Sequence, residues 1–177
     1  YNNVELLKNI FKLKKKNNLS FKLIHFSTDQ VYNNKSSYKN TEKIYPKIFN
    51  YYSQTKFLSE KIVTNQMGMV LRTNFFGKSN SNKDSFTDWI YNSFKNNKHF
   101  FLFDDVFFSP LRISSICKYI NIIIKKGVKT GVYNLGSNRG LSKYSFSIKF
   151  AKNCKIFNKN FTILKSKDFF KVSRPNY

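Results

Sequence analysis

Segments with helical and strand-like apolar spacing alternate along the chain, and this alternation restricts the fold more than any other feature. Helical segments place apolar residues three or four positions apart, whereas strand-like segments are short apolar runs bounded by polar residues. The spacing predicts helices at 4–16, 51–65, 86–96, 113–126 and 142–153, and strands at 21–27, 67–73, 100–103, 132–135 and 161–164. Segments 33–50 and 79–84 are predicted loops, and Ser85 is the predicted N-cap of the third helix. This order is typical of an α/β fold with a mostly parallel sheet.

The chain has 177 residues, which suffices for about one domain with a hydrophobic core. Its 41% hydrophobic and 18% aromatic content excludes extended disorder, because disordered chains lack the apolar side chains needed for burial. No apolar run approaches the roughly 18 residues of a membrane-spanning helix, so the sequence predicts no membrane partner.

Lysine and arginine outnumber aspartate and glutamate by 32 to 9, which gives a formal net charge of +23. One interpretation is a polyanion-binding protein, whose affinity would fall steeply with salt. The other is compositional, because Asn, Ile, Phe and Tyr are also abundant, as codons rich in A and T would produce. The basic residues are scattered and only four are arginines, whereas nucleic-acid sites usually cluster basic residues and favour arginine. We therefore predict no nucleic-acid partner.

The cysteines and histidines form no metal-binding motif. Cys117 and Cys154 lie outside any C-x-x-C pattern, and His25 and His99 each stand alone. The sequence therefore predicts no metal site. Isolated thiols are typical of proteins in a reducing compartment, which favours a cytoplasmic location.

Two segments carry side chains suited to proton transfer. Residues 27–32 (S-T-D-Q-V-Y) end a predicted strand, and parallel α/β sheets bind ligands at such ends. Tyr52 and Lys56 lie four residues apart, on one face of a predicted helix. A nearby ammonium lowers the pKa of a phenol from about 10, so that tyrosine can exchange a proton with a substrate carbonyl while Thr28 hydrogen-bonds the same oxygen. A surface lysine beside a half-buried tyrosine would show the same spacing, but the preceding strand end makes the combination more specific.

With these motifs, the chain resembles the extended short-chain dehydrogenase/reductases that act on nucleotide sugars, and within them the dTDP-4-dehydrorhamnose reductase group. The similar segments are 25–32 (H-F-S-T-D-Q-V-Y), Tyr52, Lys56 and Glu60 (Y-x-x-x-K-x-x-x-E), 71–77 (L-R-T-N-F-F-G), 108–110 (F-S-P), 131–136 (G-V-Y-N-L-G) and 174–175 (R-P). They extend over nearly the whole chain.

The resemblance implies part of a Rossmann-type, doubly wound parallel sheet whose first βαβ units are missing, followed by a small C-terminal α/β substrate-binding part. Residues 1–77 would be the C-terminal half of the NAD(P)-binding domain, with the catalytic groups. Residues 78–177 would mainly bind substrate, with some elements returning to the sheet. The glycine-rich phosphate-binding loop has no counterpart among the six glycines, so we expect the chain to be incomplete at its N-terminus, and likewise at its C-terminus.

The implied reaction is hydride transfer from NADPH or NADH to a 4-keto sugar linked to a nucleoside diphosphate, in the synthesis of surface polysaccharide. The implied catalytic residues are Thr28, Tyr52 and Lys56, with Tyr52 as the general acid. Ser27, Tyr52 and Lys56 would bind the cofactor. Asp29, Asn74 and Arg72 would bind substrate, although Arg72 could instead pair with a structural carboxylate.

Several alternatives remain open at this stage. Gln30 stands where dehydratases of this superfamily carry Glu, and an amide cannot exchange the proton that elimination of water requires. Ser53, Ser59 and Leu111 also depart from the family pattern, which weakens assignment to the rhamnose pathway itself. The other candidates are an NAD-dependent nucleotide-sugar epimerase and a non-catalytic sugar-nucleotide-binding homologue. A homodimer is a possibility for the full-length protein.

Overall fold

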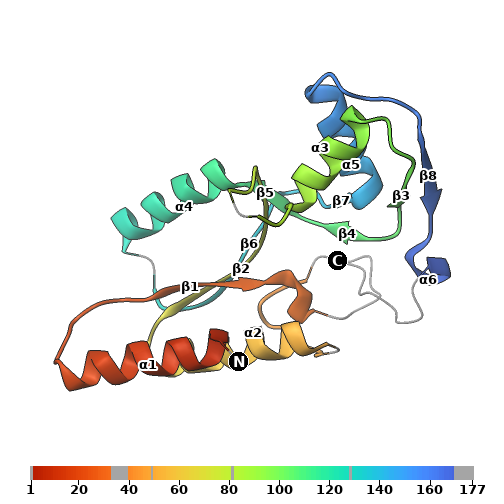
Figure 1. The fold of residues 1–177 in the computed structure, drawn as a ribbon. Helices are drawn as coiled ribbons and strands as arrows, with labels where there is room; N and C mark the ends of the chain where they lie inside the picture. Colours follow the sequence, from red (N-terminus) through yellow and green to blue (C-terminus); the bar gives the residue numbers. More distant parts are fainter. Residues whose placement is uncertain (1, 33–39, 49, 81, 128, 170–177) are drawn as a thin grey trace.

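Four parallel strands form the central sheet of the computed structural model, which describes residues 2–32, 40–48, 50–80, 82–127 and 129–169 (Figure 1). The strands are β1 (Ile24–Thr28), β2 (Met69–Phe76), β5 (Pro110–Arg112) and β6 (Gly131–Leu135). The first five residues of β2 pair with both β1 and β6, so these two strands flank it on opposite sides. The last three residues of β2 pair with β5. This parallel arrangement confirms the predicted α/β fold class.

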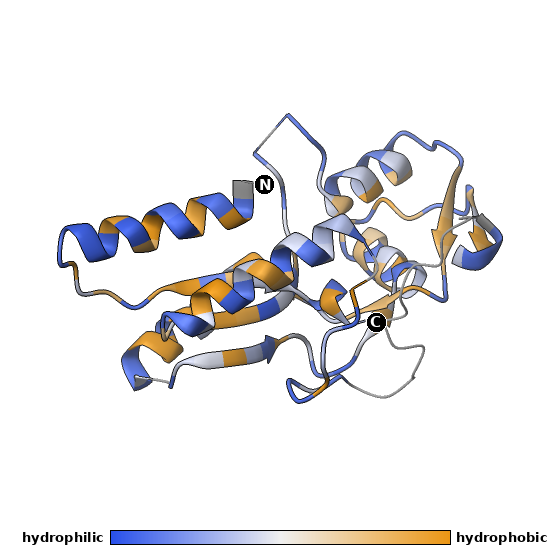
Figure 2. Cartoon of the chain, turned by 90° about the horizontal axis from the view of Figure 1, so that it is seen from below, coloured by the Kyte–Doolittle hydropathy of each residue, from blue (hydrophilic) through white to orange (hydrophobic). Residues whose placement is uncertain are grey.

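Helices cover both faces of this sheet. The helices α1 (Asn2–Lys16) and α2 (Tyr51–Asn65) pack together on one face, and α4 (Ile113–Lys126) lies on the other (Figure 1). Leu7, Val63 and Val70 are buried between α1, α2 and β2. The strands of the sheet are mostly hydrophobic, whereas the helices alternate hydrophobic and hydrophilic residues (Figure 2). This is the pattern expected when a parallel sheet is buried on both faces and its helices meet solvent.

The remaining elements form a second lobe rich in phenylalanine (Figure 1). Its elements are α3 (Phe86–Lys95), β3 (Phe100–Phe103), β4 (Phe107–Phe108), β7 (Leu141–Ser142), α5 (Lys143–Asn153), β8 (Phe161–Leu164) and α6 (Ser166–Phe169). β3 pairs with β8 in parallel, and β4 pairs with β7 antiparallel. Phe94, Phe108 and Phe146 are buried at the centre of this lobe. Their rings meet neighbouring rings mostly edge to face, an arrangement that aromatic pairs favour.

The predicted elements are present, with shifted strand ends. The first strand begins at Ile24 rather than at residue 21, because the carbonyl of Phe21 accepts a hydrogen bond from Lys14 Nζ instead of joining the sheet. β2 extends three residues beyond its predicted end, because β5 pairs with that extension. The short strands β4, β5 and β7 were not predicted. Residues 33–39 and 49 of the predicted loop, and the segment 174–175, lie outside the described residues.

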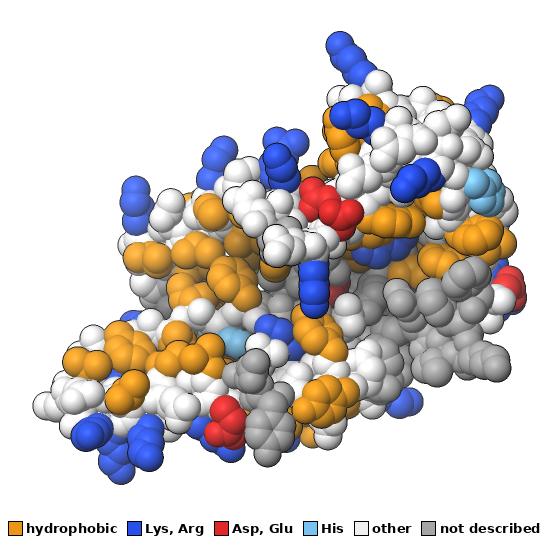
Figure 3. All heavy atoms as spheres, in the orientation of Figure 1, with side chains coloured by type: hydrophobic (Ala, Val, Ile, Leu, Met, Phe, Trp, Pro, Cys, Tyr) orange, Lys and Arg blue, Asp and Glu red, His pale blue; other side chains and the backbone are white. Residues whose placement is uncertain are grey.

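The surface of the described residues shows where charge and apolar side chains gather. Lys and Arg are spread over the face shown in Figure 3 rather than collected in one patch. Apolar side chains of α4 are exposed, among them Ile122 and Ile124. No helix in the described part of the chain has the length and apolar character that crossing a bilayer requires.

The predicted N-cap at Ser85 is confirmed, and it makes a capping box with Asp88. Ser85 Oγ accepts from the Asp88 amide, and Asp88 Oδ2 accepts from the Ser85 amide. We expect Ser85→Ala to lower the free energy of unfolding by about 1 kcal/mol, the usual loss when an N-cap hydroxyl is removed. Urea denaturation measures the change, with the exposed loop residue Asn82→Ala as the control. Equal stability of the two variants would contradict the assignment.

Candidate active site

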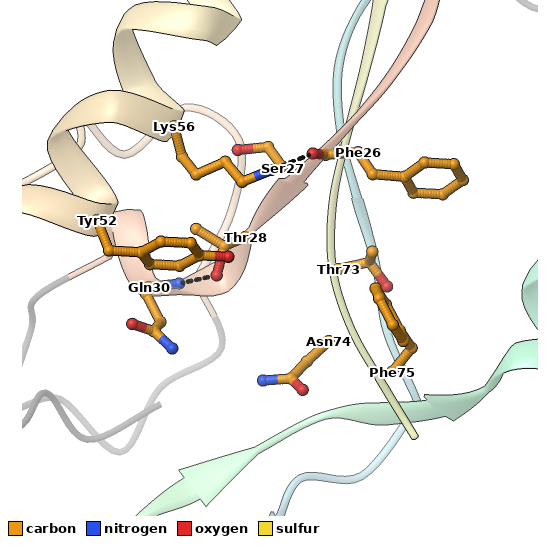
Figure 4. Close-up of a pocket in the computed structure, with 9 residues that line it drawn as sticks. All are labelled: Phe26, Ser27, Thr28, Gln30, Tyr52, Lys56, Thr73, Asn74 and Phe75. Carbon is orange, nitrogen blue, oxygen red and sulfur yellow. Dashed lines mark hydrogen bonds between the residues drawn. The ribbon is translucent and has the colours of Figure 1, made fainter. Parts of the chain in front are cut away.

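A pocket of about 290 Å³ lies where β1, β2 and the start of α2 meet (Figure 4). Its lining includes Thr28, Tyr52, Lys56 and Asn74, which the sequence predicted as site residues. Thr28 and Asn74 come from the carboxyl ends of neighbouring parallel strands, where ligands bind in sheets of this kind. The structure therefore brings these predicted residues to one place.

The hydroxyls of Thr28 and Tyr52 lie near each other in the pocket (Figure 4). The helix α2 begins at Tyr51 because Asn50 caps it, with Asn50 Oδ1 accepting from the amide of Ser53. Tyr52 is therefore in the first turn, and its hydroxyl lies on the same side of the pocket as the Thr28 hydroxyl (Figure 4). Thr28 Oγ1 also accepts from the amide of Gln30 at 3.2 Å. The main chain thus fixes the position of the Thr28 hydroxyl at the end of β1, and this hydroxyl donates to Asp29 Oδ1 at 3.5 Å.

Lys56 does not lower the pKa of Tyr52 in this structure, contrary to the prediction. Its ammonium donates a hydrogen bond to the carbonyl of Phe26 at 3.1 Å. The pKa of Tyr52 is raised, mainly by burial of the phenol and also by the charge of Asp29, while the hydrogen bond from Thr28 opposes the shift. The pKa of Lys56 is lowered by burial, against the opposing charge of Glu60. The phenol is therefore fully protonated at neutral pH.

Asp29 and Asn74 form a pair at the sheet edge. Asn74 Nδ2 donates to both carboxylate oxygens of Asp29 at 3.3 Å. Burial raises the pKa of Asp29 to about 6, although the bond from Asn74 and the charge of Lys143 oppose the shift. Asn74 lines the pocket, whereas Asp29 lies outside the lining and contacts Asn74 from there.

Arg72 contacts a structural carboxylate and not the pocket. The residue is 5% exposed, and its Nε and Nη2 donate to Glu60 at distances of 2.6 to 3.2 Å. Its Nη1 donates to the hydroxyl of Tyr32 at 2.7 Å. All three guanidinium nitrogens are therefore bound within the protein. Of the two alternatives that the sequence left open for Arg72, the structure shows the structural one, and the expected substrate contact is corrected accordingly.

Ser27 lines the pocket, but its hydroxyl donates to the carboxylate of Glu60. The hydroxyl hydrogen of Ser27 is therefore not available for the predicted contact with the cofactor. Glu60, which the sequence analysis noted only as part of a motif, is the partner of both Ser27 and Arg72.

Several residues near the pocket had no predicted role, among them Phe26. Thr73 and Phe75 line it from β2, and Phe75 is 55% exposed. Lys143, at the start of α5, lies 3.9 Å and 3.7 Å from the ring centroids of Phe86 and Phe108, and its charge acts on Asp29. Thr73 and Phe75 could have been expected near the pocket, because they lie in the same strand end as Arg72 and Asn74. No signal distinguished Lys143 from the many other lysines.

Neither cysteine nor histidine forms a metal site among the residues that the structure describes. No group of three or more His, Cys, Asp or Glu side chains there could hold a metal ion. Cys117 and Cys154 are both exposed free thiols.

The raised pKa of Asp29 predicts a pH-dependent contribution to stability. Between its ordinary pKa of 3.8 and about 6, the folded protein holds this proton more tightly than the unfolded chain, so stability falls as pH rises. His25 acts in the opposite sense, because burial and the charge of Lys56 lower its pKa from 6.5 to about 4. Asp29→Asn removes only the first effect. The free energy of unfolding of this variant, relative to the parent, should therefore rise by up to about 3 kcal/mol from pH 4 to pH 7.

Urea denaturation of the parent and of Asp29→Asn at pH 4, 5, 6 and 7 checks this prediction. A constant difference between the two proteins over this range would show that Asp29 ionises with its ordinary pKa in the folded state.

Comparison with known proteins identifies the family. A family model described as the RmlD substrate binding domain matches residues 3–177. The chain belongs to this family. A comparison with curated protein sequences finds no match.

Solved structures with the same fold include several nucleotide-sugar enzymes. A dTDP-4-dehydrorhamnose reductase from Bacillus anthracis, in complex with NADP, is 22% identical with a TM-score of 0.77, and the alignment covers 88% of this chain and 55% of that one. The reductase from Yersinia enterocolitica is 19% identical with a TM-score of 0.78, covering 96% and 60%. A dTDP-glucose 4,6-dehydratase from Bacillus anthracis, in complex with NAD, is 21% identical with a TM-score of 0.77, covering 93% and 55%. This member of the RmlD family thus shares their fold and spans little more than half their length.

Proposed function

We propose that this chain is the catalytic and substrate-binding part of an NAD(P)-dependent reductase acting on a nucleotide-linked 4-keto sugar. The observation that carries the proposal is the meeting of the Thr28 and Tyr52 hydroxyls in one pocket at the sheet edge (Figure 4). Two hydroxyls that converge on a small space can both hydrogen-bond one ketone oxygen. Residues 1–77 would carry the catalytic groups, and residues 78–177 would mainly bind the sugar nucleotide.

The raised pKa of Tyr52 supports the direction of this reaction. A phenol that stays protonated at neutral pH can donate a proton to the oxygen of a ketone as that ketone is reduced. Thr28, held by the amide of Gln30, would stabilise the negative charge that develops on the same oxygen. Asn74 would contact the sugar, with Asp29 holding its amide.

The pocket residues fit the reactive end of a nicotinamide dinucleotide. The cofactor would supply the hydride, and Lys56 and Tyr52, which line the same pocket, would hold its ribose. Lys56 offers an ammonium and Tyr52 a phenol, which suit the hydroxyls of a sugar. Relatives in the same fold carry NADP or NAD.

A second candidate is an epimerase that uses the same residues. A UDP-N-acetylglucosamine 4-epimerase from Bacillus cereus has the same fold, with a TM-score of 0.75 at 19% identity. An epimerase must first take a proton from a substrate hydroxyl, which requires an ionised phenol. The same Thr28 and Tyr52 hydroxyls serve either reaction, so the assay described below distinguishes the two. Gln30 lines the pocket, and its amide cannot exchange the proton that elimination of water requires. This disfavours a dehydratase.

The test is a cofactor-oxidation assay on the protein that contains this chain, with NADPH or NADH and dTDP- or UDP-linked 4-keto sugars. A reductase consumes one cofactor for each ketone converted to an alcohol. An epimerase interconverts two sugar nucleotides with no net cofactor consumption. Binding of the sugar nucleotide without either reaction would identify a non-catalytic homologue and refute the proposal.

A further inference from the structure

The carboxylate of Glu60 joins three elements beneath the pocket. Glu60 is 2% exposed and lies one helical turn after Lys56 on α2. It accepts hydrogen bonds from the hydroxyl of Ser27 on β1 and from Nε and Nη2 of Arg72 on β2. One side chain thus fastens the helix to both strands that end at the pocket.

These contacts follow the register of the sheet. Ser27 and Arg72 are direct partners in the pairing of β1 with β2, so the carboxylate bridges a single pair of facing residues. The next pair, Thr28 and Thr73, lines the pocket.

Three successive turns of α2 each meet one of the last three residues of β1. Tyr52 faces Thr28, Lys56 Nζ donates to the carbonyl of Phe26, and Glu60 holds Ser27 (Figure 4). A rotation or shift of α2 on the sheet would therefore have to break the Glu60 contacts. The position of Glu60 fixes how far Lys56 and Tyr52 reach into the pocket.

Glu60 also determines the charge around Lys56. His25 on β1 and Glu60 on α2 each act electrostatically with Lys56. Tyr52 lines the same pocket, and Arg72 on β2 carries the positive charge paired with Glu60. Burial lowers the pKa of Lys56 and favours the neutral amine, whereas Glu60 raises it and favours the ammonium. His25 is neutral at physiological pH, because its own pKa is lowered to about 4. The charge of Glu60 thus offsets the effect of burial on the pKa of Lys56.

We propose that Glu60 is a positioning residue that fixes both the place and the charge of Lys56 in the pocket. It touches neither the expected substrate nor the expected cofactor and acts through its neighbours. The meaning of this role for catalysis rests on the proposed function, but the role itself concerns contacts within the chain and can be tested without turnover.

The test measures how fast Lys56 reacts with a limiting amount of an amine-directed ester between pH 7 and pH 10, read by peptide mass spectrometry. Only the neutral amine reacts, so a fall of one unit in the pKa of Lys56 gives about a tenfold faster reaction below that pKa. We expect a gain of about this size in Glu60→Gln. The double variant E60M/R72M leaves no unpaired ion to destabilise the fold. It should show a gain in the same direction but smaller, because it removes the repulsion of Arg72 together with the attraction of Glu60. Ser27→Ala keeps the Glu60–Arg72 pair and should react like the parent.

An unchanged labelling profile in a folded E60M/R72M would overturn the proposal and leave Glu60 with a purely structural role. That variant also covers the case in which Glu60→Gln does not fold. The labelling result does not depend on cofactor oxidation. A faster reaction of Lys56 in a protein without reductase activity would therefore refute the proposed function and leave the role of Glu60 intact.

Discussion

Replacing Tyr52 with Phe is expected to lower the turnover of the proposed reductase by about 10²–10⁴-fold, the range for loss of a positioned general acid. The substitution removes one oxygen atom and leaves the ring that packs beside Thr28 (Figure 4). The fold should therefore be retained, and the loss should appear in kcat rather than in the affinity for the sugar nucleotide. Steady-state oxidation of NADPH or NADH with the keto sugar measures both.

Tyr51 provides a matched control for this experiment. It precedes Tyr52 in the same helical turn, is 66% exposed and does not line the pocket. Tyr51→Phe makes the same chemical change one residue away and should leave turnover close to that of the parent. Equal effects of the two substitutions would show that the Tyr52 hydroxyl donates no proton in the reaction.

Replacing Arg72 with Met is expected to lower the free energy of unfolding by about 3–5 kcal/mol, because it leaves the buried Glu60 carboxylate without its positively charged partner. The Arg72 and Glu60 side chains are 4% and 2% exposed, and their shortest N–O distance is 2.6 Å. Water can therefore not replace the lost guanidinium without opening the packing of α2 on the sheet. Urea denaturation gives the change directly.

Two further variants show whether the effect comes from burial of the ion pair. Lys8→Met breaks the exposed Lys8–Glu5 pair, whose side chains are 58% and 47% exposed, and should cost less than about 1 kcal/mol. E60M/R72M should recover most of the stability lost in Arg72→Met, since an apolar pair leaves no buried charge. An Arg72→Met protein as stable as the parent but with weakened substrate binding would instead support the substrate contact of Arg72 that was predicted from the sequence.

The parts of the fold that could be predicted are those with local signals. The helix at 51–65 was predicted with the bounds that the structure shows, because helical spacing is a property of neighbouring residues. β4 and β7 have two residues each, which is too short for any periodicity. Their pairing depends on how the second lobe packs, and no local pattern reports this.

In the candidate site, too, some features could be predicted from the sequence and others depend on tertiary contacts. Thr28, Tyr52 and Asn74 could be predicted to lie together, because carboxyl ends of parallel strands share one edge and the following helix begins there. The partner of Arg72 could not, because the Glu60 contact depends on the register that sets Arg72 opposite Ser27. The pKa of Tyr52 was predicted with the wrong sign, because spacing along a helix does not reveal that Lys56 bonds to the carbonyl of Phe26 instead.

The eight residues of β2 join the central sheet to the second lobe, so the length of this strand sets how the two parts are placed. Its first five residues hold the central sheet together, and its last three carry Asn74 and Phe75 and pair with β5 at the entrance to the second lobe. Side chains alternate between the two faces of a strand, so a one-residue insertion after Thr73 would turn Asn74 and Phe75 to the opposite faces. It would also displace the second lobe by about 3.3 Å, the rise of one strand residue. Homologues should therefore tolerate neither insertion nor deletion within this strand.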